Sequence, residues 1–110
     1  MRATVMALTM CLGIPAAAAA QDAKVTKGAE VYAAQKCAMC HSIGDKGNKK
    51  GPLDGVGSKV STADIRLWMT DAKAMTAKTK AARKPDMKSY ALPNDDLDAL
   101  VAYMVSLKKP

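Results

Sequence analysis

The chain of 110 residues contains no phenylalanine, one tryptophan and three tyrosines. A small domain buries a limited share of its surface, so it depends strongly on the volume of its core side chains. With so few aromatic rings, the side chains alone give a marginal core. We therefore expect the chain to need a further apolar body to complete it.

Histidine and cysteine are also scarce, with one histidine and three cysteines in the chain. The single histidine, His41, directly follows the pair Cys37 and Cys40. This C-x-x-C-H spacing is typical of covalent haem attachment, in which both thiols add to haem vinyl groups and the imidazole binds iron. The sequence therefore predicts haem c as cofactor, with a haem that also supplies the missing core volume.

Two other readings of the motif are weighed against haem. A redox-active C-x-x-C pair opens a helix after a strand, but the segment before Cys37 has a helical pattern. A zinc site takes about four ligands, and the third cysteine, Cys11, lies in a predicted leader. Only three ligands are available near the motif, so the haem interpretation is favoured.

Acidic residues are fewer than basic ones, 10 against 17, which gives a formal net charge of +7. The lysines are scattered and no aromatic side chains interleave with them, so the pattern does not indicate nucleic-acid binding. A basic surface instead favours acidic protein partners.

The first 20 residues have the outline of a secretory signal peptide, with basic Arg2, an apolar stretch and a run of alanines at 16–20. Cleavage after Ala20 would leave one domain at 21–110 and would place it in the periplasm. The alternative is an uncleaved membrane anchor, because residues 3–20 carry no charge.

Three helices are predicted in the remaining chain. The first covers about 26–36, with Thr26 as its N-cap and with Gly28 and Tyr32 on one face. The second follows the capping-box pattern that begins at Ser61. The third begins at Pro93 and Asn94. The expected buried stripes are Ile65, Trp68, Met69 and Ala72 in the second helix, and Leu97, Leu100, Val101, Met104 and Leu107 in the third.

A loop with five of the seven glycines lies between the first two helices, at 44–57. Such a segment can wrap closely around a planar ligand but cannot form a stable helix. Residues 76–84 are expected to be irregular or weakly helical, and Pro85 stops any helix there.

Because the chain has no second histidine, methionine sulfur is the remaining soft donor for the second axial position of the iron. Met39 lies within the attachment motif, and Met69 and Met104 fall on apolar stripes. We favour Met87, which follows Pro85 in a non-helical stretch, because a weak ligand needs a preorganised loop. Met75 is the next candidate, and an open iron is the last.

This order of parts resembles the class I monohaem cytochromes c over nearly all of residues 21–110. The resemblance rests on C-x-x-C-H at the end of a first helix and on four further elements. These are Gly51–Pro52–Leu53, the helix with Trp68, the segment from Pro85 to Met87, and the last helix from Leu97 to Met104. It implies an all-α cytochrome c fold, with three main helices and loops wrapped around one covalent haem.

The resemblance also implies roles for individual residues. The Pro52 carbonyl would accept the Nδ1 proton of His41, and Trp68 and Tyr90 would line the haem pocket. Gly28 and Tyr32 would pack against Leu100 and Tyr103 or Met104, where the terminal helices cross.

With His41 and Met87 both bound to iron, no site is open to substrate. We therefore expect a monomeric one-electron carrier rather than an enzyme, with redox proteins that present acidic docking surfaces as partners. One alternative is a haem enzyme or gas-binding protein with an open distal site. Another is the haem subunit of a larger periplasmic oxidoreductase.

Overall fold

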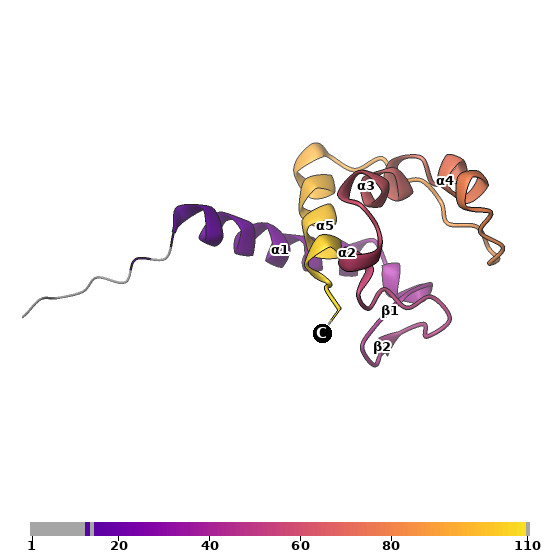
Figure 1. Cartoon of the computed structure of the whole chain (residues 1–110), viewed down its shortest axis with the longest axis horizontal. Helices are drawn as coiled ribbons and strands as arrows, with labels where there is room; N and C mark the ends of the chain where they lie inside the picture. Colours follow the sequence, from indigo (N-terminus) through magenta and orange to yellow (C-terminus); the bar gives the residue numbers. More distant parts are fainter. Residues whose placement is uncertain (1–12, 14, 110) are drawn as a thin grey trace, which may run out of the picture.

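The computed structural model describes residues 13 and 15–109. These residues are mainly helical, which confirms the all-α prediction, and their two strands, of two residues each, pair in one short hairpin (Figure 1). The elements in chain order are α1 (Ala16–Ala34), the 3₁₀ turn η1 (Cys37–Met39), β1 (Ser42–Ile43), β2 (Lys46–Gly47), α2 (Val56–Lys59), α3 (Thr62–Thr70), α4 (Ala72–Thr79) and α5 (Asn94–Ser106).

Helix α1 begins at Ala16 and not at Thr26, so the predicted N-cap is wrong. The Thr26 hydroxyl instead donates a hydrogen bond to the Asp22 carbonyl inside the helix, at 3.0 Å. The alanines at 16–20 are strong helix formers and carry the helix toward the N-terminus. The predicted cleavage point after Ala20 falls within α1. It stays a prediction, since residues 1–12 and 14 lie outside the described residues.

Helices α1 and α5 cross at Gly28, as the family resemblance implies, but the nearest residues of α5 are Ala99 and Tyr103, where Leu100 was expected beside Tyr103 or Met104. A Cβ at Gly28 would overlap the Ala99 carbonyl oxygen and lie 2.6 Å from the Tyr103 Cβ. One turn later, the rings of Tyr32 and Tyr103 pack edge to face with centroids 5.7 Å apart. The absence of a side chain at Gly28 therefore sets how closely the two helices approach.

Helix α3 follows its predicted cap, because the Ser61 hydroxyl accepts a hydrogen bond from the Asp64 amide at 3.1 Å. Its apolar stripe ends earlier than predicted. Asp71 follows the last residue of α3, and its carboxylate caps α4. Ala72 is fully buried, but it belongs to α4 and not to α3. Of the tract at 76–84, expected to be irregular or weakly helical, the part up to Thr79 belongs to α4.

The core lies between α1, α3 and α5, and α5 begins where it was predicted, at Asn94. Leu107, the last residue of the predicted stripe, is only partly buried and packs against the core edge. The buried core cluster consists of Val31, Ile65, Met69, Leu97, Leu100, Val101 and Met104.

The C-terminal residues are bonded to the glycine-rich segment. The Gly57 amide donates to the Leu107 carbonyl at 2.9 Å, and the Lys109 amide donates to the Ser58 hydroxyl at 3.0 Å. A Cβ at Gly57 would overlap the Val105 carbonyl oxygen, so this contact also requires glycine. Residues 107–109 thus hold α2 in place against the end of α5.

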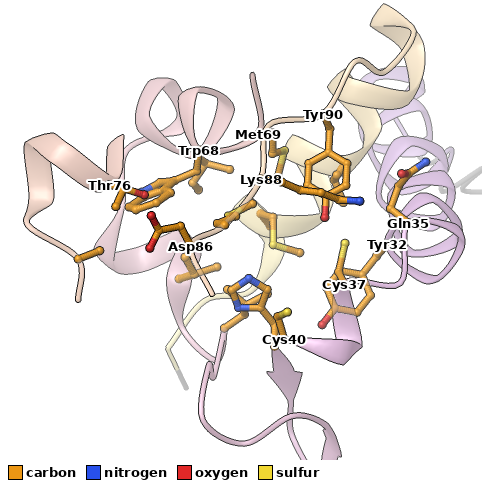
Figure 2. A pocket seen from close by; sticks show the side chains of 18 of the residues that line it. Tyr32, Gln35, Cys37, Cys40, Trp68, Met69, Thr76, Asp86, Lys88 and Tyr90 are labelled. Carbon is orange, nitrogen blue, oxygen red and sulfur yellow. The ribbon is translucent and has the colours of Figure 1, made fainter. Parts of the chain in front are cut away.

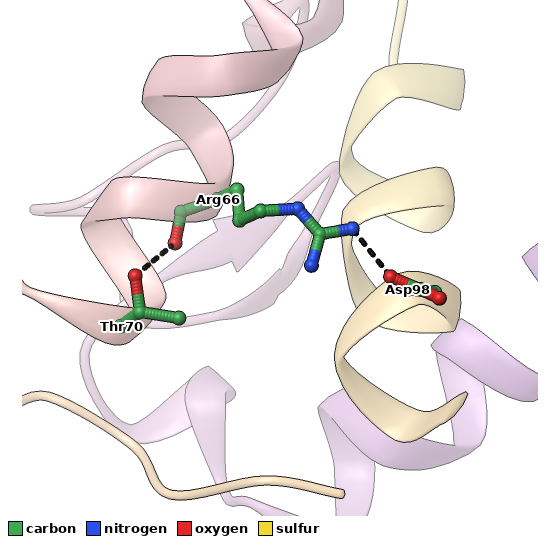
Figure 3. Close-up of polar contacts among 3 residues, drawn as sticks. All are labelled: Arg66, Thr70 and Asp98. Atoms are coloured by element: carbon green, nitrogen blue, oxygen red, sulfur yellow. Dashed lines mark hydrogen bonds and ion pairs between the residues drawn. The ribbon is translucent and has the colours of Figure 1, made fainter. Parts of the chain in front are cut away.

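An ion pair on the surface joins α3 to α5. The Arg66 guanidinium donates to the Asp98 carboxylate, and the Thr70 hydroxyl donates to the Arg66 carbonyl at 3.2 Å (Figure 3). The hydrogen bond from Arg66 holds the pKa of Asp98 below its ordinary value. None of the helices formed by the described residues is long and apolar enough to cross a membrane.

Candidate functional site

A cavity of about 540 Å³ lies beside the core and is lined mainly by apolar side chains. This volume is within the usual range for sites that hold a small molecule or cofactor. The two cysteines and the histidine of the C-x-x-C-H motif all lie on its lining. The cavity lining also includes Tyr32, Lys36, Leu53, Val56, Val60, Ile65, Trp68, Met69, Arg83, Met87, Lys88, Tyr90, Leu100 and Met104.

The motif reaches the cavity through a tight turn. Lys36 adopts a left-handed conformation, with φ 57°, which ends α1 and starts η1. The amides of Cys40 and His41 then both donate to the Cys37 carbonyl, at 3.1 and 2.9 Å. This turn places both thiols and the imidazole at one cavity.

The two thiols differ in their surroundings. Cys40 is exposed, whereas Cys37 is partly covered and burial raises the pKa of its thiol. The described residues contain no group of three or more histidine, cysteine or carboxylate side chains arranged to hold a metal ion. The zinc interpretation of the motif therefore gains no support from the structure.

The His41 ring is fixed by a backbone carbonyl, but the acceptor is Gly51 and not Pro52. His41 Nδ1 lies 3.0 Å from the Gly51 oxygen, which also accepts a hydrogen bond from the Ser42 amide at 3.1 Å. Burial lowers the pKa of His41, the Gly51 hydrogen bond opposes that shift, and the charge of Arg83 adds to the lowering. The imidazole therefore favours its neutral form, which is the form that binds metals.

The prediction for Pro52 is wrong because of the strand register. Ser42 pairs with Pro52 in a parallel bridge, in which the Gly51 carbonyl accepts from Ser42 and the Leu53 amide donates to Ser42, at 2.8 Å. Successive carbonyls of an extended strand point in opposite directions. Pro52 is exposed and does not line the cavity, whereas Leu53 does.

The methionines separate into two groups. Met69, Met87 and Met104 line the cavity, whereas Met75 does not, although it is buried. Met39 is 71% exposed and also lies outside the lining. Met69 and Met104 belong to the core cluster of the helices, so Met87 is the cavity methionine on a segment without helix.

Trp68 and Tyr90, both predicted to line the pocket, do line this cavity. In Figure 2, Trp68 lies on the opposite side of the cavity from Cys37 and Tyr32. The Tyr90 amide donates to the Met69 carbonyl at 2.7 Å, which joins the Met87 segment to α3. The Lys88 ammonium lies 5.1 Å from the centre of the Tyr90 ring, and burial raises the pKa of that tyrosine.

Two features of the site have little signal in the sequence. The hydroxyl of Tyr32 is buried and has no hydrogen-bond partner among the described residues. Burial is the main cause that raises the pKa of Tyr32 to about 12. Arg83, which in sequence is one cation of a basic tract, lines the cavity and contacts the attachment motif. No sequence pattern distinguishes it from its lysine neighbours.

Comparison with known proteins gives one match. The model of the family described as Cytochrome c matches residues 25–108, which is most of the chain. The matched range includes the whole C-x-x-C-H motif and every described residue that lines the cavity. A search of curated proteins and a search of solved structures each found no significant match.

Proposed function

Because this chain belongs to the cytochrome c family, we propose that it carries single electrons between redox proteins through one haem, with His41 and Met87 as axial iron ligands. The family binds haem c covalently and is one of haem-based electron transfer. The proposal adds the ligand pair, the single haem typical of the class I branch, and the partners. One observation carries it: a single cavity is lined by the C-x-x-C-H motif and by Met87.

The residues around the cavity fit a haem. Its lining is mainly apolar, as the faces of a large planar ring require, and two thiols border it. Cys37 and Cys40 would hold the ring through thioether bonds, and His41 would bind iron. When bound, haem supplies a one-electron couple between Fe(II) and Fe(III).

The Gly51 carbonyl prepares His41 for this role. By accepting the Nδ1 proton at 3.0 Å, it leaves the lone pair on Nε2 free for a metal and fixes the plane of the ring. Because Gly51 is also bonded to the Ser42 amide, its carbonyl is held in position from two sides. A ligand that does not move between the oxidised and reduced states keeps the reorganisation energy of electron transfer small.

Met87 is proposed as the second ligand because of its place among the cavity methionines. Met69 and Met104 are 6% and 4% exposed and pack in the helical core, where a methionine commonly serves as filler. Met87 lies on the non-helical segment after α4, which can bring a side chain over the ring. With both axial positions filled by the protein, iron has no open site, so the chain would be a carrier and not an enzyme.

The rim of the cavity indicates the kind of partner. Lys36, Arg83 and Lys88 are exposed and line the cavity, and the formal charge of the chain is +7. We propose transient docking of the monomeric carrier with acidic redox proteins, which would weaken as salt increases. The proposed location is the bacterial periplasm after removal of residues 1–20. The leader pattern and the usual extracellular or periplasmic location of cytochrome c domains support it.

Isosteric methionine variants test the ligand assignment. We expect M87L to abolish the methionine-to-iron charge-transfer band of the oxidised, haem-loaded protein and to let reduced iron bind carbon monoxide. The control M75L, at a buried methionine outside the cavity lining, should keep the band and exclude carbon monoxide. Replacement of a methionine by leucine costs little packing energy, about 1.5 kcal/mol or less. Native high-spin iron, or an unchanged band in M87L, would refute the His/Met assignment.

A further inference from the structure

The segment between α4 and α5 that carries Met87 has few connections to the rest of the molecule. It is joined to the helices at both ends, by the Ala81 amide to the Thr76 carbonyl at 3.1 Å and by the Tyr90 amide to the Met69 carbonyl at 2.7 Å. Near the second point, the Ser89 hydroxyl also accepts a hydrogen bond from the Ala72 amide at 2.9 Å, and residues 82–88 lie between these connections. Among the described residues, one hydrogen bond joins 82–88 to another part of the chain.

That hydrogen bond is made by Arg83. Its Nη1 donates to the Cys40 carbonyl at 2.5 Å, across 43 positions in sequence. Cys40 is the second cysteine of the attachment motif and directly precedes His41. The guanidinium therefore connects the segment that carries one proposed iron ligand to the segment that carries the other.

The opposite side of this contact is shaped to admit the guanidinium. A Cβ at Gly51 would overlap both Arg83 Nη1 and the Cys40 carbonyl oxygen. Gly51 is not among the glycines in the left-handed region, so it is the space beside it that requires glycine. The same residue supplies the carbonyl that holds His41 Nδ1.

The charge of Arg83 also lies close to the proposed iron ligand. The Arg83 guanidinium lines the same cavity as His41 and bonds to the carbonyl of Cys40, the residue directly before it. A fixed positive charge at this place disfavours additional positive charge on a metal bound to His41. Fe(III) carries one more positive charge than Fe(II), so the Arg83 charge stabilises the reduced state relative to the oxidised state.

We propose that Arg83 is a positioning residue that holds the Met87 segment against the haem-attachment motif, and that its charge raises the midpoint potential of the haem. The expected effect of Arg83 on the bond between Met87 and iron rests on the proposed His/Met ligation; the rest of the inference does not. The contact between residues 82–88 and Cys40 is a property of the chain itself. It is tested below without reference to the ligand.

The test compares R83Q with K80Q in the haem-loaded protein. Both variants remove one positive charge from the same stretch, but Lys80 makes no side-chain hydrogen bond or ion pair among the described residues. In R83Q we expect the two amides whose hydrogen bonds anchor the segment to α3 and α4, those of Tyr90 and Ala72, to exchange hydrogen about three- to tenfold faster than in the wild type, because one exposed hydrogen bond that holds the segment is lost. K80Q should leave these amides unchanged.

Redox titration and spectroscopy complete the test. The midpoint potential should fall more in R83Q than in K80Q, and R83K, which keeps the charge, should stay closer to the wild type than R83Q. The methionine-to-iron band of R83Q should disappear at a lower denaturant concentration than that of K80Q. If R83Q matches K80Q in amide exchange and in potential, the inference is overturned.

The two proposals fail in different ways. An unchanged charge-transfer band in M87L would refute the ligand assignment, yet faster exchange of the Tyr90 and Ala72 amides in R83Q would still support the tether. Loss of the band in M87L, together with wild-type exchange and potential in R83Q, would refute the role of Arg83 alone.

Discussion

Substitution of Gly28 by alanine tests the helix crossing that closes the domain. The added Cβ would overlap the Ala99 carbonyl oxygen and would lie 2.6 Å from the Tyr103 Cβ, so α1 and α5 must move apart. The Ala99 carbonyl belongs to a helix backbone and cannot rotate away as a flexible side chain would. The strain should therefore be near the upper end of the usual range for overpacking, about 3 kcal/mol.

Part of this cost is offset within α1. Alanine is favoured over glycine inside a helix by about 1 kcal/mol, so G28A should lower the free energy of unfolding by about 2 kcal/mol. For a domain of this size, that corresponds to a melting temperature lower by about 8–16 °C. The edge-to-face packing of Tyr32 on Tyr103 should loosen in the same variant.

The assay is thermal unfolding of the haem-loaded protein, followed by far-ultraviolet circular dichroism. E30A serves as the control, because Glu30 is an exposed residue of the same helix and its replacement should change stability by no more than about 0.5 kcal/mol. A G28A protein as stable as the wild type, or more stable, would show that the helices do not meet at Gly28.

Two further substitutions probe titrating side chains. The Arg66 hydrogen bond lowers the folded-state pKa of Asp98 below its ordinary value of 3.8, so the stability it adds is present at neutral pH and is lost as the pH falls below that value. Chemical denaturation at pH 7 and pH 3 should therefore differ less in D98N than in the wild type, and an equal difference would contradict the role of the pair. Burial raises the folded-state pKa of Tyr32 from 10.0 to about 12, so wild-type stability should fall as the pH rises through that interval. Y32F should flatten this fall and, by removing a buried hydroxyl without a partner, should stabilise the protein at neutral pH by up to about 1 kcal/mol; a destabilised Y32F would reveal a missed hydrogen bond.

The features that the sequence predicts well are local in the chain. The cap at Ser61, the start of α5 at Asn94 and the buried stripe of α5 depend on residues within a few positions of one another. The meeting of Gly28 with the last helix was also predictable, through the resemblance to a family in which the terminal helices cross. The start of α1 was predicted too late, since Thr26 suits both a cap and a helix interior.

The errors at the site arise from register and from distant contacts. The choice between the Gly51 and Pro52 carbonyls depends on the bridge from Ser42, and a shift by one residue reverses the direction of each carbonyl. Arg83 reaches Cys40 across 43 positions, and no local pattern marks it among the neighbouring lysines. Such contacts become visible only when the chain is folded.

The bonds between residues 107–109 and α2 have a consequence for the order in which parts of an exported chain become available to a cofactor. Val56, the first residue of α2, and Val60, the residue after this helix, line the cavity. Helix α2 is fixed by its bonds to the Leu107 carbonyl and the Lys109 amide. In the proposed export the N-terminal part of the chain crosses first, so Cys37 and Cys40 arrive about seventy residues before this side of the cavity can close. During that interval the thiols border an unfinished pocket, which gives a large rigid cofactor an open path to both of them before the chain folds around it.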